Sequence, residues 1–328
     1  MKISICIPTY NYAQFISQTI KSILDQKIDS SIYEIVVGDS SNNNKTFKII
    51  NKFKKIKKNI IYKKFKKKEG IDIDLEKTTQ LCRGEYIVFL SSDDCLVPGS
   101  INLILKNLES KNSVYLFNRI ICDKNLKIKK KSNWLNGSVG NKVFLFYCYK
   151  SLNYYLKNSN SIGALFSYMS CIIVKKKLYK QVSIKKKFIG TNYLHVQKIL
   201  DILFDNKSSL KYLKDYLVFF RGDNDSFKKD GYLNRIIMDF YGYQLFFIRY
   251  FANSKSSNHF LKLMRKEHKF YFLIRVGEYL RSKNEWTNLK NYLKFFKYNL
   301  LQIYFIKILG KSIFLILILR RMKKFFGI

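Results

Sequence analysis

The chain has 328 residues, of which 47% are hydrophobic and 26% charged, so it can bury a sizeable core and is not globally disordered. Its formal net charge of +38 suggests an anionic partner: nucleic acid, acidic lipid headgroups or phosphorylated substrates. Lys, Ile, Asn, Phe and Tyr are encoded by A/T-rich codons, and compositional drift accounts for about half of this excess.

Strands alternate with helices over the first 110 residues. Apolar runs at 3–7, 35–37 and 86–90 indicate buried strands, and 60–62 indicates a further one. Helical patterns lie between them, at 15–24, at 75–82 before Gly84, and from Pro98 onward. The alternation predicts an α/β fold whose parallel sheet is covered by helices on both faces.

The pattern changes beyond about residue 110. Residues 114–117 indicate a strand, and 236–251 indicate a helix rich in aromatic side chains. The last forty residues are apolar and basic, and their apolar run at 314–319 is too short to span a bilayer. Basic residues follow it at 320–324, so we predict an interfacial helix facing lipid phosphates, with a core-packing helix as the alternative.

Two blocks of the chain are basic without any acidic residue. Residues 45–68 contain twelve lysines, and nine basic residues follow Glu285. Solvated helix faces normally mix both signs of charge, so these blocks favour an anionic surface as a partner.

Cysteine spacing and the N-terminus indicate the compartment. The six cysteines are far apart and form no Cys-x-x-Cys pair, which argues against disulfides and structural zinc. The first residues lead directly into an apolar strand and lack the features of a signal peptide. We therefore expect a cytoplasmic protein.

Polar loops follow three of the predicted strands, at residues 8–11, 38–41 and 91–94. Ligands of parallel α/β sheets bind at the carboxyl ends of the strands, so these loops are expected to form one site. Asp93 and Asp94 have the ligand chemistry to hold Mg²⁺ or Mn²⁺ together with diphosphate oxygens, although adjacent acids also occur as helix caps or turns. Asp39 is suited to bind a pyrimidine edge or to cap a helix.

The three segments together resemble a known family. Residues 5–11 (ICIPTYN), 34–40 (EIVVGDS) and 84–94 (GEYIVFLSSDD), followed by Pro98, are similar in order and spacing to family 2 glycosyltransferases. The resemblance implies the GT-A fold, with a Rossmann-like, mostly parallel sheet flanked by helices, here followed by a basic and apolar helical region. It also implies transfer of a hexosyl or deoxyhexosyl group from a nucleotide-sugar donor with the help of Mg²⁺ or Mn²⁺.

Site residues follow from the same resemblance. It implies that Asp93 is the metal-binding acid, with Asp94 as a possible second ligand. The residues expected to bind the nucleotide-sugar are Pro8, Thr9, Tyr10, Asp39, Ser92, Asp93 and Arg221. Thr9 and Tyr10 can line the base pocket or only shape the turn, and Arg221 can clamp the diphosphate bidentately or form an ordinary loop salt bridge.

Further segments are similar to an abequosyltransferase-like branch of this family. They are residues 118–119, 122–123, 163–170, 190–196 and 221–227. The branch implies a lipid-linked glycan acceptor, such as O-antigen or capsule. Together with the predicted interfacial helix, we expect a peripheral position on the anionic inner face of the cytoplasmic membrane.

The sequence departs from the family pattern at two places. Ser91 stands where many relatives have the first acid of the metal motif, which leaves Asp93 to act alone or with Asp94. Residues 191–195 contain no acid where many inverting relatives place their base. His195, Asp223 and Asp225 are the candidate bases, and a buried structural role is the alternative for His195.

We expect three parts: a nucleotide-sugar-binding part at 1–110, an acceptor-binding part at 111–230 and a helical region at 231–328. Two other functions stay open. The basic blocks suit a nucleic-acid-binding protein, but they lack Gly-aromatic RNA-binding signatures, so no specific nucleic acid is expected. Ser91 favours a catalytically inactive scaffold in glycan assembly.

Overall fold

A computed structural model describes residues 1–224, 231–252, 254–277, 279–280 and 282–309. The chain divides into two compact units, Met1–Asn224 and Asp225–Ile328. The predicted base Asp225, the predicted apolar run at 314–319 and the basic residues at 320–324 lie outside the described residues.

The first unit is built on a ten-stranded sheet with the order β3-β2-β1-β4-β9-β6-β10-β5, with β7 on β6 and β8 on β10. Its strands are β1 (Ile3–Thr9), β2 (Tyr33–Asp39), β3 (Ile60–Lys64), β4 (Tyr86–Phe89), β5 (Cys95–Leu96), β6 (Val114–Cys122), β7 (Ile128–Ser132), β8 (Lys142–Leu145), β9 (Ile172–Lys175) and β10 (Ser209–Arg221). The α/β prediction is confirmed, but the sheet is mixed rather than wholly parallel. Strands β3, β2, β1 and β4 are parallel to one another. Strand β9 runs antiparallel to its neighbours β4 and β6, and β6 pairs in parallel with β10.

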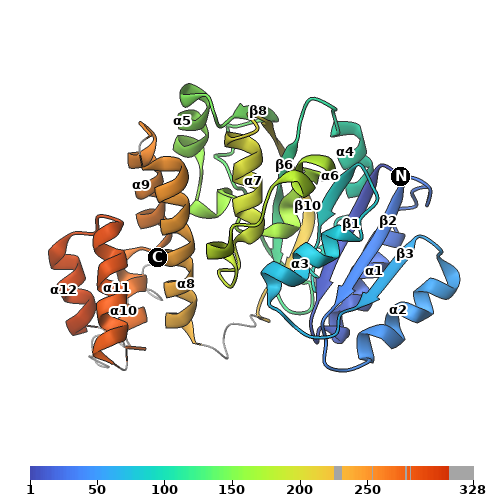
Figure 1. Cartoon of the computed structure of the whole chain (residues 1–328), viewed down its shortest axis with the longest axis horizontal. Coiled ribbons are helices and arrows are strands. Elements are labelled where there is room, and N and C mark those ends of the chain that lie inside the picture. Colours follow the sequence, from blue (N-terminus) through green and yellow to red (C-terminus); the bar gives the residue numbers. More distant parts are fainter. Residues whose placement is uncertain (225–230, 253, 278, 281, 310–328) are drawn as a thin grey trace. The chain divides into compact units, whose positions relative to one another are not determined.

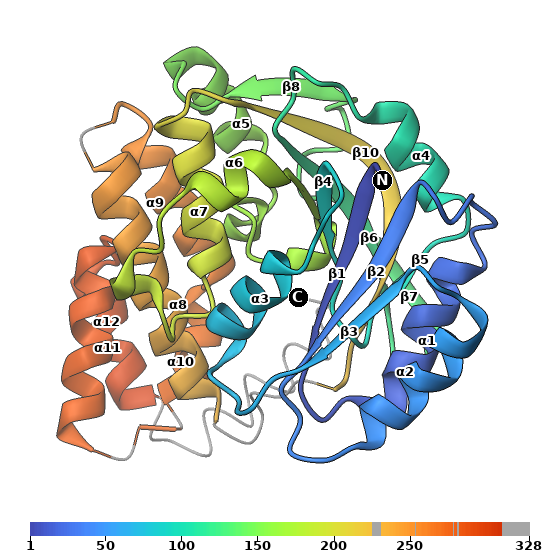
Figure 2. The ribbon, with the colours of Figure 1, turned by 45° about the vertical axis from the view of Figure 1, so that its right-hand side comes forward.

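Helices cover both faces of this sheet. They are α1 (Ala13–Leu24), α2 (Lys45–Ile56), α3 (Ile71–Gln80), α4 (Ser100–Asn107), α5 (Tyr149–Asn158), α6 (Lys176–Gln181) and α7 (Leu194–Phe204). Figures 1 and 2 show α3, α6 and α7 on one face and α1, α2 and α4 on the other. Strands β1, β2 and β4 are fully buried between these layers, as their continuous apolar runs predict.

Close packing explains one glycine in β2. A Cβ at Gly38 would lie 2.0 Å from Thr78 Oγ1 in α3 and 2.8 Å from the Phe65 ring. Because neither space nor a flexible neighbour is available there, only glycine lets α3 approach the end of β2. This contact places α3 beside the loop that begins at Asp39.

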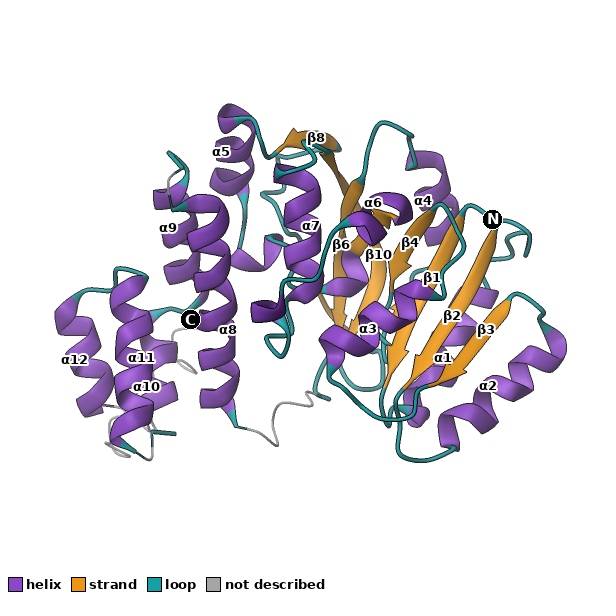
Figure 3. Ribbon diagram, viewed as in Figure 1, coloured by secondary structure: helices purple, strands orange, loops and turns teal. Residues whose placement is uncertain are grey.

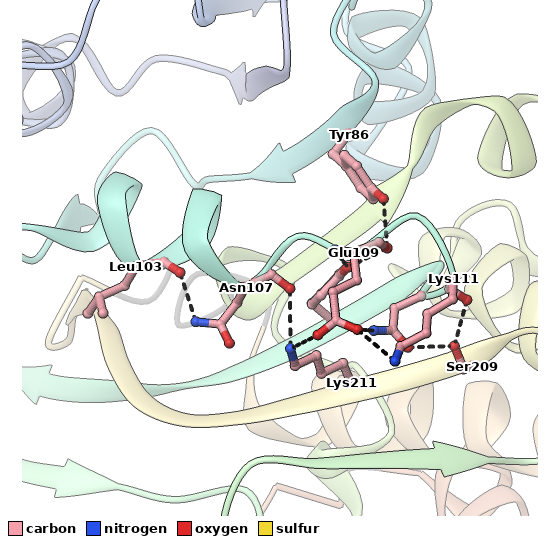
Figure 4. Close-up of polar contacts among 9 residues, drawn as sticks. Tyr86, Leu103, Asn107, Glu109, Lys111, Ser209 and Lys211 are labelled. Carbon is pink, nitrogen blue, oxygen red and sulfur yellow. Dashed lines mark hydrogen bonds and ion pairs between the residues drawn. The ribbon is translucent and has the colours of Figure 1, made fainter.

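Glu109 stabilises the edge of the sheet where β4, β6 and β10 begin (Figure 4). Its carboxylate accepts hydrogen bonds from Lys211 in β10 and is 3.1 Å from Lys111 Nζ. Its carbonyl oxygen accepts a 3.0 Å hydrogen bond from the Tyr86 hydroxyl at the start of β4. The turn from α4 into β6 is thereby tied to β10 and to β4, at the edge opposite the carboxyl ends of β1, β2 and β4.

The second unit consists of helices in its described part. They are α8 (Tyr232–Phe246), followed by a π-helical turn at Phe247–Phe251, and α9 (Ser257–Glu267), α10 (Phe270–Gly277), α11 (Lys283–Phe295) and α12 (Leu300–Leu309). Aromatic rings form much of its core, with Phe240 packed against His268 at 4.9 Å and against Phe296 at 5.4 Å between centroids. A capping box of Ser282 and Glu285 begins α11. No helix in the described ranges is both long and apolar enough to cross a membrane.

Candidate active site

The carboxyl ends of β1 and β2 meet at one edge of the sheet, where Figure 3 shows the arrowheads of β1, β2 and β3. Parallel pairing aligns Thr9 with Asp39. The Ser40 backbone N–H donates to Thr9 O at 3.0 Å, and the Asn11 backbone N–H donates to Ser41 Oγ at 2.8 Å. The first two polar loops are therefore brought together, as expected for parallel strands.

Asp39 is completely buried in this edge and has three internal donors. Its Oδ1 accepts from the Ser41 backbone N–H at 2.8 Å. Its Oδ2 accepts from the Tyr62 hydroxyl at 2.7 Å and lies 3.4 Å from Lys64 Nζ. Such a network holds the carboxylate rigidly and compensates for its desolvation.

Tyr62 and Lys64 were not identified as site residues from the sequence. They lie two residues apart on β3, so their side chains share one face of the sheet. Pairing of β3 with β2 places Lys64 directly opposite Asp39. The sequence at 60–64 indicates a strand, but that Tyr62 and Lys64 contact Asp39 depends on the pairing of β3 with β2, which the sequence does not show.

Pro8 and Thr9 end β1, and Tyr10 follows directly after it. The Thr9 side chain is buried, and its Oγ1 has no hydrogen-bond partner among the described residues. Lys68 Nζ lies 4.3 Å above the Tyr10 ring. A buried hydroxyl with unused hydrogen-bonding capacity at this edge indicates a position where a polar ligand atom can be bound.

Asp93 is partly exposed in the loop after β4 and is the centre of a second group of contacts. Its Oδ1 accepts from the Ser91 hydroxyl, and its Oδ2 accepts from Asn224 Nδ2 at 2.6 Å. The Asn224 carbonyl in turn accepts a 3.3 Å hydrogen bond from the hydroxyl of Tyr12, just beyond the first loop. Ser92 is buried, and its carbonyl accepts from Thr19 Oγ1 in α1.

Asp94, the second predicted metal ligand, is buried and internally bonded in this structure. Its Oδ2 accepts from the hydroxyls of Tyr168 and Ser170, and its Oδ1 accepts from the Arg221 backbone N–H at 3.0 Å. Burial, with the neighbouring charge of Asp93, raises the pKa of Asp94 to about 7 although these donors oppose the shift. With 1% of its surface exposed and both carboxylate oxygens hydrogen-bonded, Asp94 holds the loop that carries Asp93 against Tyr168 and Ser170.

Arg221, predicted to clamp a diphosphate, has internal acceptors for all three guanidinium nitrogens. Nε donates to Asp93 O at 2.6 Å, Nη1 to Lys124 O at 2.6 Å and Nη2 to Gln18 Oε1 at 2.7 Å. Its guanidinium also lies 4.6 Å from the Phe15 ring centroid, and the residue is 2% exposed. Clamping a diphosphate would require these bonds to break, so in this structure Arg221 holds the Asp93 loop in place.

His195 lies in the first turn of α7 and is buried, and no acidic side chain bonds to it in the part of the chain that the structure describes. Its Nε2 lies 3.1 Å from Phe166 O, so the neutral ring donates to this carbonyl. The preceding loop is held by Asp72, whose carboxylate accepts from the backbone N–H groups of Gly190 and Leu194. No contact joins His195 to Asp93 among the described residues.

The buried histidine predicts a specific loss of stability in acid. Burial lowers the pKa of His195 to about 4, below its unfolded value, and the bond to Phe166 O opposes the shift only in part. The unfolded chain therefore gains a proton first, and stability is lost as the pH falls from about 6.5 towards 4. We expect this group to remove about 2 kcal/mol of unfolding free energy between pH 7.5 and pH 5.

Urea unfolding of the wild type and of His195→Asn at the two pH values measures this contribution. The difference in stability between the two chains should shrink by about 2 kcal/mol at the lower pH. An unchanged difference would show that His195 is protonated in the folded chain and would contradict the neutral, buried assignment.

Asp223 follows Arg221 in an exposed turn. Its carboxylate forms a 2.6 Å ion pair with Lys129 Nζ, and its backbone has a φ of 61°. A positive φ is uncommon for a residue with a side chain, and strained positions of this kind cluster at functional sites. Asp223 adjoins Asn224, the partner of Asp93, whereas the third candidate base, Asp225, is outside the described residues.

The acidic groups of the site limit how a metal can bind. Within the described ranges, no group of three or more His, Cys, Asp and Glu side chains is arranged to hold an ion. Asp93 is the partly exposed carboxylate of its loop, with the Ser91 hydroxyl beside it. The arrangement suits an ion that takes most of its ligands from phosphate oxygens and water, as Mg²⁺ commonly does.

Comparison with known proteins identifies the family. A family model described as "Glycosyl transferase family 2" matches residues 4–183. The abequosyltransferase RfbV of Salmonella typhimurium is 31% identical over 246 residues, which cover 74% of this chain and 73% of that protein. The poly(ribitol-phosphate) beta-N-acetylglucosaminyltransferase TarP of Staphylococcus aureus is 33% identical over 98 residues, 29% of each chain.

Solved structures share the fold at low sequence identity. S. aureus TarS 1–349 matches with a TM-score of 0.64 and 16% identity over 90% of this chain and 80% of that chain. The mannosyltransferase PcManGT from Pyrobaculum calidifontis, in complex with GDP-Man and Mn²⁺, matches with a TM-score of 0.52 and 13% identity over 99% of this chain and 87% of that chain. The predicted GT-A architecture is thereby confirmed. The chain belongs to glycosyl transferase family 2 and is a nucleotide-sugar-dependent glycosyltransferase.

Proposed function

We propose that this enzyme transfers a hexosyl or deoxyhexosyl group from a nucleotide-sugar to a lipid-linked surface glycan such as O-antigen or capsule. The observation that carries the proposal is the shared sheet edge of the Asp39 and Asp93 loops, linked by Tyr12 and Asn224. The long match to an abequosyltransferase supports this class of acceptor. TarS has also been solved in complex with UDP-GlcNAc, which supports a donor of the nucleotide-sugar class.

The donor binds between the first two loops in this proposal. Pro8, Thr9, Tyr10 and Asp39 surround the nucleoside, with the buried Asp39 presenting a fixed hydrogen-bond acceptor. The unpaired hydroxyl of Thr9 supplies a further polar contact. Ser92 and Asp93 face the diphosphate side of the donor.

The proposed cofactor is Mg²⁺ or Mn²⁺, held by Asp93. One partly exposed carboxylate with an adjacent hydroxyl fits an ion whose remaining ligands come from the diphosphate and water. When bound, the ion would neutralise charge that develops on the leaving diphosphate. The Mn²⁺ complex of the structurally similar PcManGT supports this assignment.

The proposed base is Asp223. Its carboxylate is half exposed, whereas His195 is buried and bonded to a carbonyl. An acceptor hydroxyl can reach an exposed carboxylate beside the Asp93 loop and transfer its proton there. Its oxygen then bonds to the sugar while the bond from the sugar to the donor's diphosphate breaks and the nucleoside diphosphate leaves. A 2.6 Å ion pair with Lys129 Nζ holds this carboxylate in place.

A donor screen tests the proposed activity. CDP-, UDP-, GDP- and dTDP-sugars are incubated with the full chain, with and without Mn²⁺, and release of the nucleoside diphosphate is measured. We expect one nucleotide class to be turned over, faster with Mn²⁺ than without. Absence of turnover with every donor, in the presence of an acceptor lipid, would contradict the proposed activity.

We also propose that the enzyme is peripheral on the anionic inner face of the cytoplasmic membrane. Helix α12 supports this, because its large apolar side chains are exposed together. They are Leu300 (69%), Leu301 (68%), Tyr304 (61%), Phe305 (46%) and Ile308 (46%). Lys307 on the same helix and Lys297 just before it are also exposed, the combination expected of an interfacial helix.

Removing this apolar surface is expected to release the protein from lipid. Deletion of the residues after Asn299 should move the chain from the membrane to the soluble fraction, because both the apolar and basic anchors are lost. The substitution pair Leu300→Gln and Leu301→Gln should weaken sedimentation with phosphatidylglycerol vesicles, whereas Asn291→Gln on α11 should not. A full-length chain that stays soluble throughout would overturn the membrane assignment.

A further inference from the structure

Arg119, on β6, lies inside a cage of three aromatic rings. Its guanidinium carbon is 4.4 Å from the Trp134 ring centroid, 4.6 Å from Tyr168 and 5.0 Å from Phe220. The cage is itself well ordered, because Tyr168 and Phe220 pack edge to face at 5.0 Å. Three rings around one cation fix the direction of the guanidinium plane without using its N–H groups.

The polar atoms of this arginine have no internal acceptor. Its Nε is buried without a hydrogen-bond partner, and no hydrogen bond or ion pair reaches its guanidinium from any residue in the described part of the chain. Arg221 differs, since each of its three nitrogens donates to a carbonyl or amide oxygen. Arg119 is partly buried, and a buried N–H donor that lacks an acceptor is costly, so the unused Nε indicates a position where a ligand can bind.

The cage adjoins the candidate active site directly. Tyr168, one wall of the cage, donates its hydroxyl hydrogen bond to Asp94, next to Asp93. Trp134, another wall, is held by bonds from its backbone N–H to Asn118 Oδ1 and from its Nε1 to Phe117 O, both 3.0 Å. A Cβ at Gly163 would come within 2.9 Å of the Trp134 ring, so the adjoining loop packs against that ring.

We propose that Arg119 is a substrate-binding residue that takes a phosphate group of one of the two substrates. A guanidinium in a partly desolvated aromatic setting is weakly hydrated and presents a planar fork that matches phosphate oxygens. The inference rests on the proposed function, in which two substrates carry phosphate: the donor has a diphosphate, and the lipid-linked acceptor has a phosphate. Between them we favour the acceptor, because β6 lies two strands away from β4 in the sheet.

Calorimetric titration with inorganic pyrophosphate tests the proposal at 150 mM NaCl, with the full chain. Arg119→Gln should weaken binding at least about 10-fold, because a charge-assisted hydrogen-bond pair is lost. Arg119→Lys should recover only part of it, since an ammonium lacks the fork. The matched control is Arg83→Gln, which removes one positive charge, as Arg119→Gln does, but at an exposed position. This control should bind pyrophosphate as the wild type does.

A second arm separates the two sources. The pyrophosphate titration is repeated with saturating nucleoside diphosphate of the class that the donor screen selects. Binding that persists and still depends on Arg119 assigns the site to the acceptor. Pyrophosphate binding that the nucleotide abolishes, with Arg119→Gln weakening the nucleoside diphosphate but not the nucleoside, assigns it to the donor.

Folding controls keep the test falsifiable. Because its guanidinium makes no internal hydrogen bond, Arg119→Met should melt close to the wild-type temperature, whereas Arg221→Met should melt well below it. Equal pyrophosphate and nucleotide binding by the wild type and Arg119→Gln would overturn the proposal, as would a melting loss in Arg119→Met as large as that of Arg221→Met. The titration measures binding and requires no sugar transfer. A chain that binds pyrophosphate through Arg119 but transfers no sugar would therefore contradict the proposed function and leave the role of Arg119 standing.

Discussion

Replacement of Asp93 by asparagine is expected to lower kcat/KM for sugar transfer by about 100- to 1000-fold. Asparagine preserves the shape of the side chain, and its amide oxygen can still accept from Ser91 or Asn224, so the loop should keep its conformation. The variant loses the negative charge that would hold a divalent ion against the diphosphate. Loss of one preorganised electrostatic contact of this kind commonly reduces turnover by this factor.

Steady-state kinetics with the donor identified by the screen measures the effect, with Mn²⁺ varied. The control is Asp25→Asn, which removes an exposed carboxylate at the end of α1 and should keep wild-type kinetics. In cells, the glycan profile of a strain carrying Asp93→Ala should lose the product. An unchanged profile would support an inactive scaffold, the role that Ser91 favoured from the sequence.

Substitution of Lys198 by methionine is expected to destabilise the first unit by about 3–5 kcal/mol. Lys198 in α7 is 1% exposed, and its Nζ lies 2.9 Å from both carboxylate oxygens of Glu76 in α3. Its ammonium also lies 4.1 Å from the Tyr179 ring centroid. Burial lowers the pKa of Lys198, and the charge of Glu76 opposes that shift. Methionine would leave the Glu76 carboxylate without its counter-charge at a largely buried position.

Urea unfolding of the two single variants and of the double variant measures the pair. Addition of Glu76→Gln to Lys198→Met should restore part of the lost stability, because the unpaired charge is removed. Lys177→Met, at an exposed position of α6, should change stability by less than about 0.5 kcal/mol. A loss in Lys198→Met as small as that of this control would contradict a stabilising role for the ion pair.

Much of the fold follows from local patterns in the sequence. The apolar runs at 3–7, 35–37 and 86–90 correspond to β1, β2 and β4, and the polar loops after them lie where parallel strands place a ligand site. These predictions succeed because strand ends and turns depend on neighbouring residues. The family resemblance was carried by the segments at these strand ends, and the match of the family model to residues 4–183 confirms it.

The partners of each site residue depend on strand order and therefore required the structure. Asp39 is bonded to Tyr62 because β3 pairs with β2, and Asp94 is bonded to Tyr168, 74 residues further along the chain. Adjacent acids in the sequence thus differ in environment: Asp94 is 1% exposed and internally satisfied, whereas Asp93 is partly exposed.

Arg221 and Arg119 show most clearly what the sequence determines and what depends on the tertiary structure. The sequence by itself determined an α/β fold with three polar loops at strand ends, because periodicity and turn residues are local properties, and its motifs resembled those of family 2 glycosyltransferases. It assigned the diphosphate contact to Arg221, whose donors are occupied in the structure, and gave Arg119 no role. Whether a guanidinium has acceptors depends on which carbonyls and rings the sheet brings within hydrogen-bonding distance, and only the tertiary structure decides that.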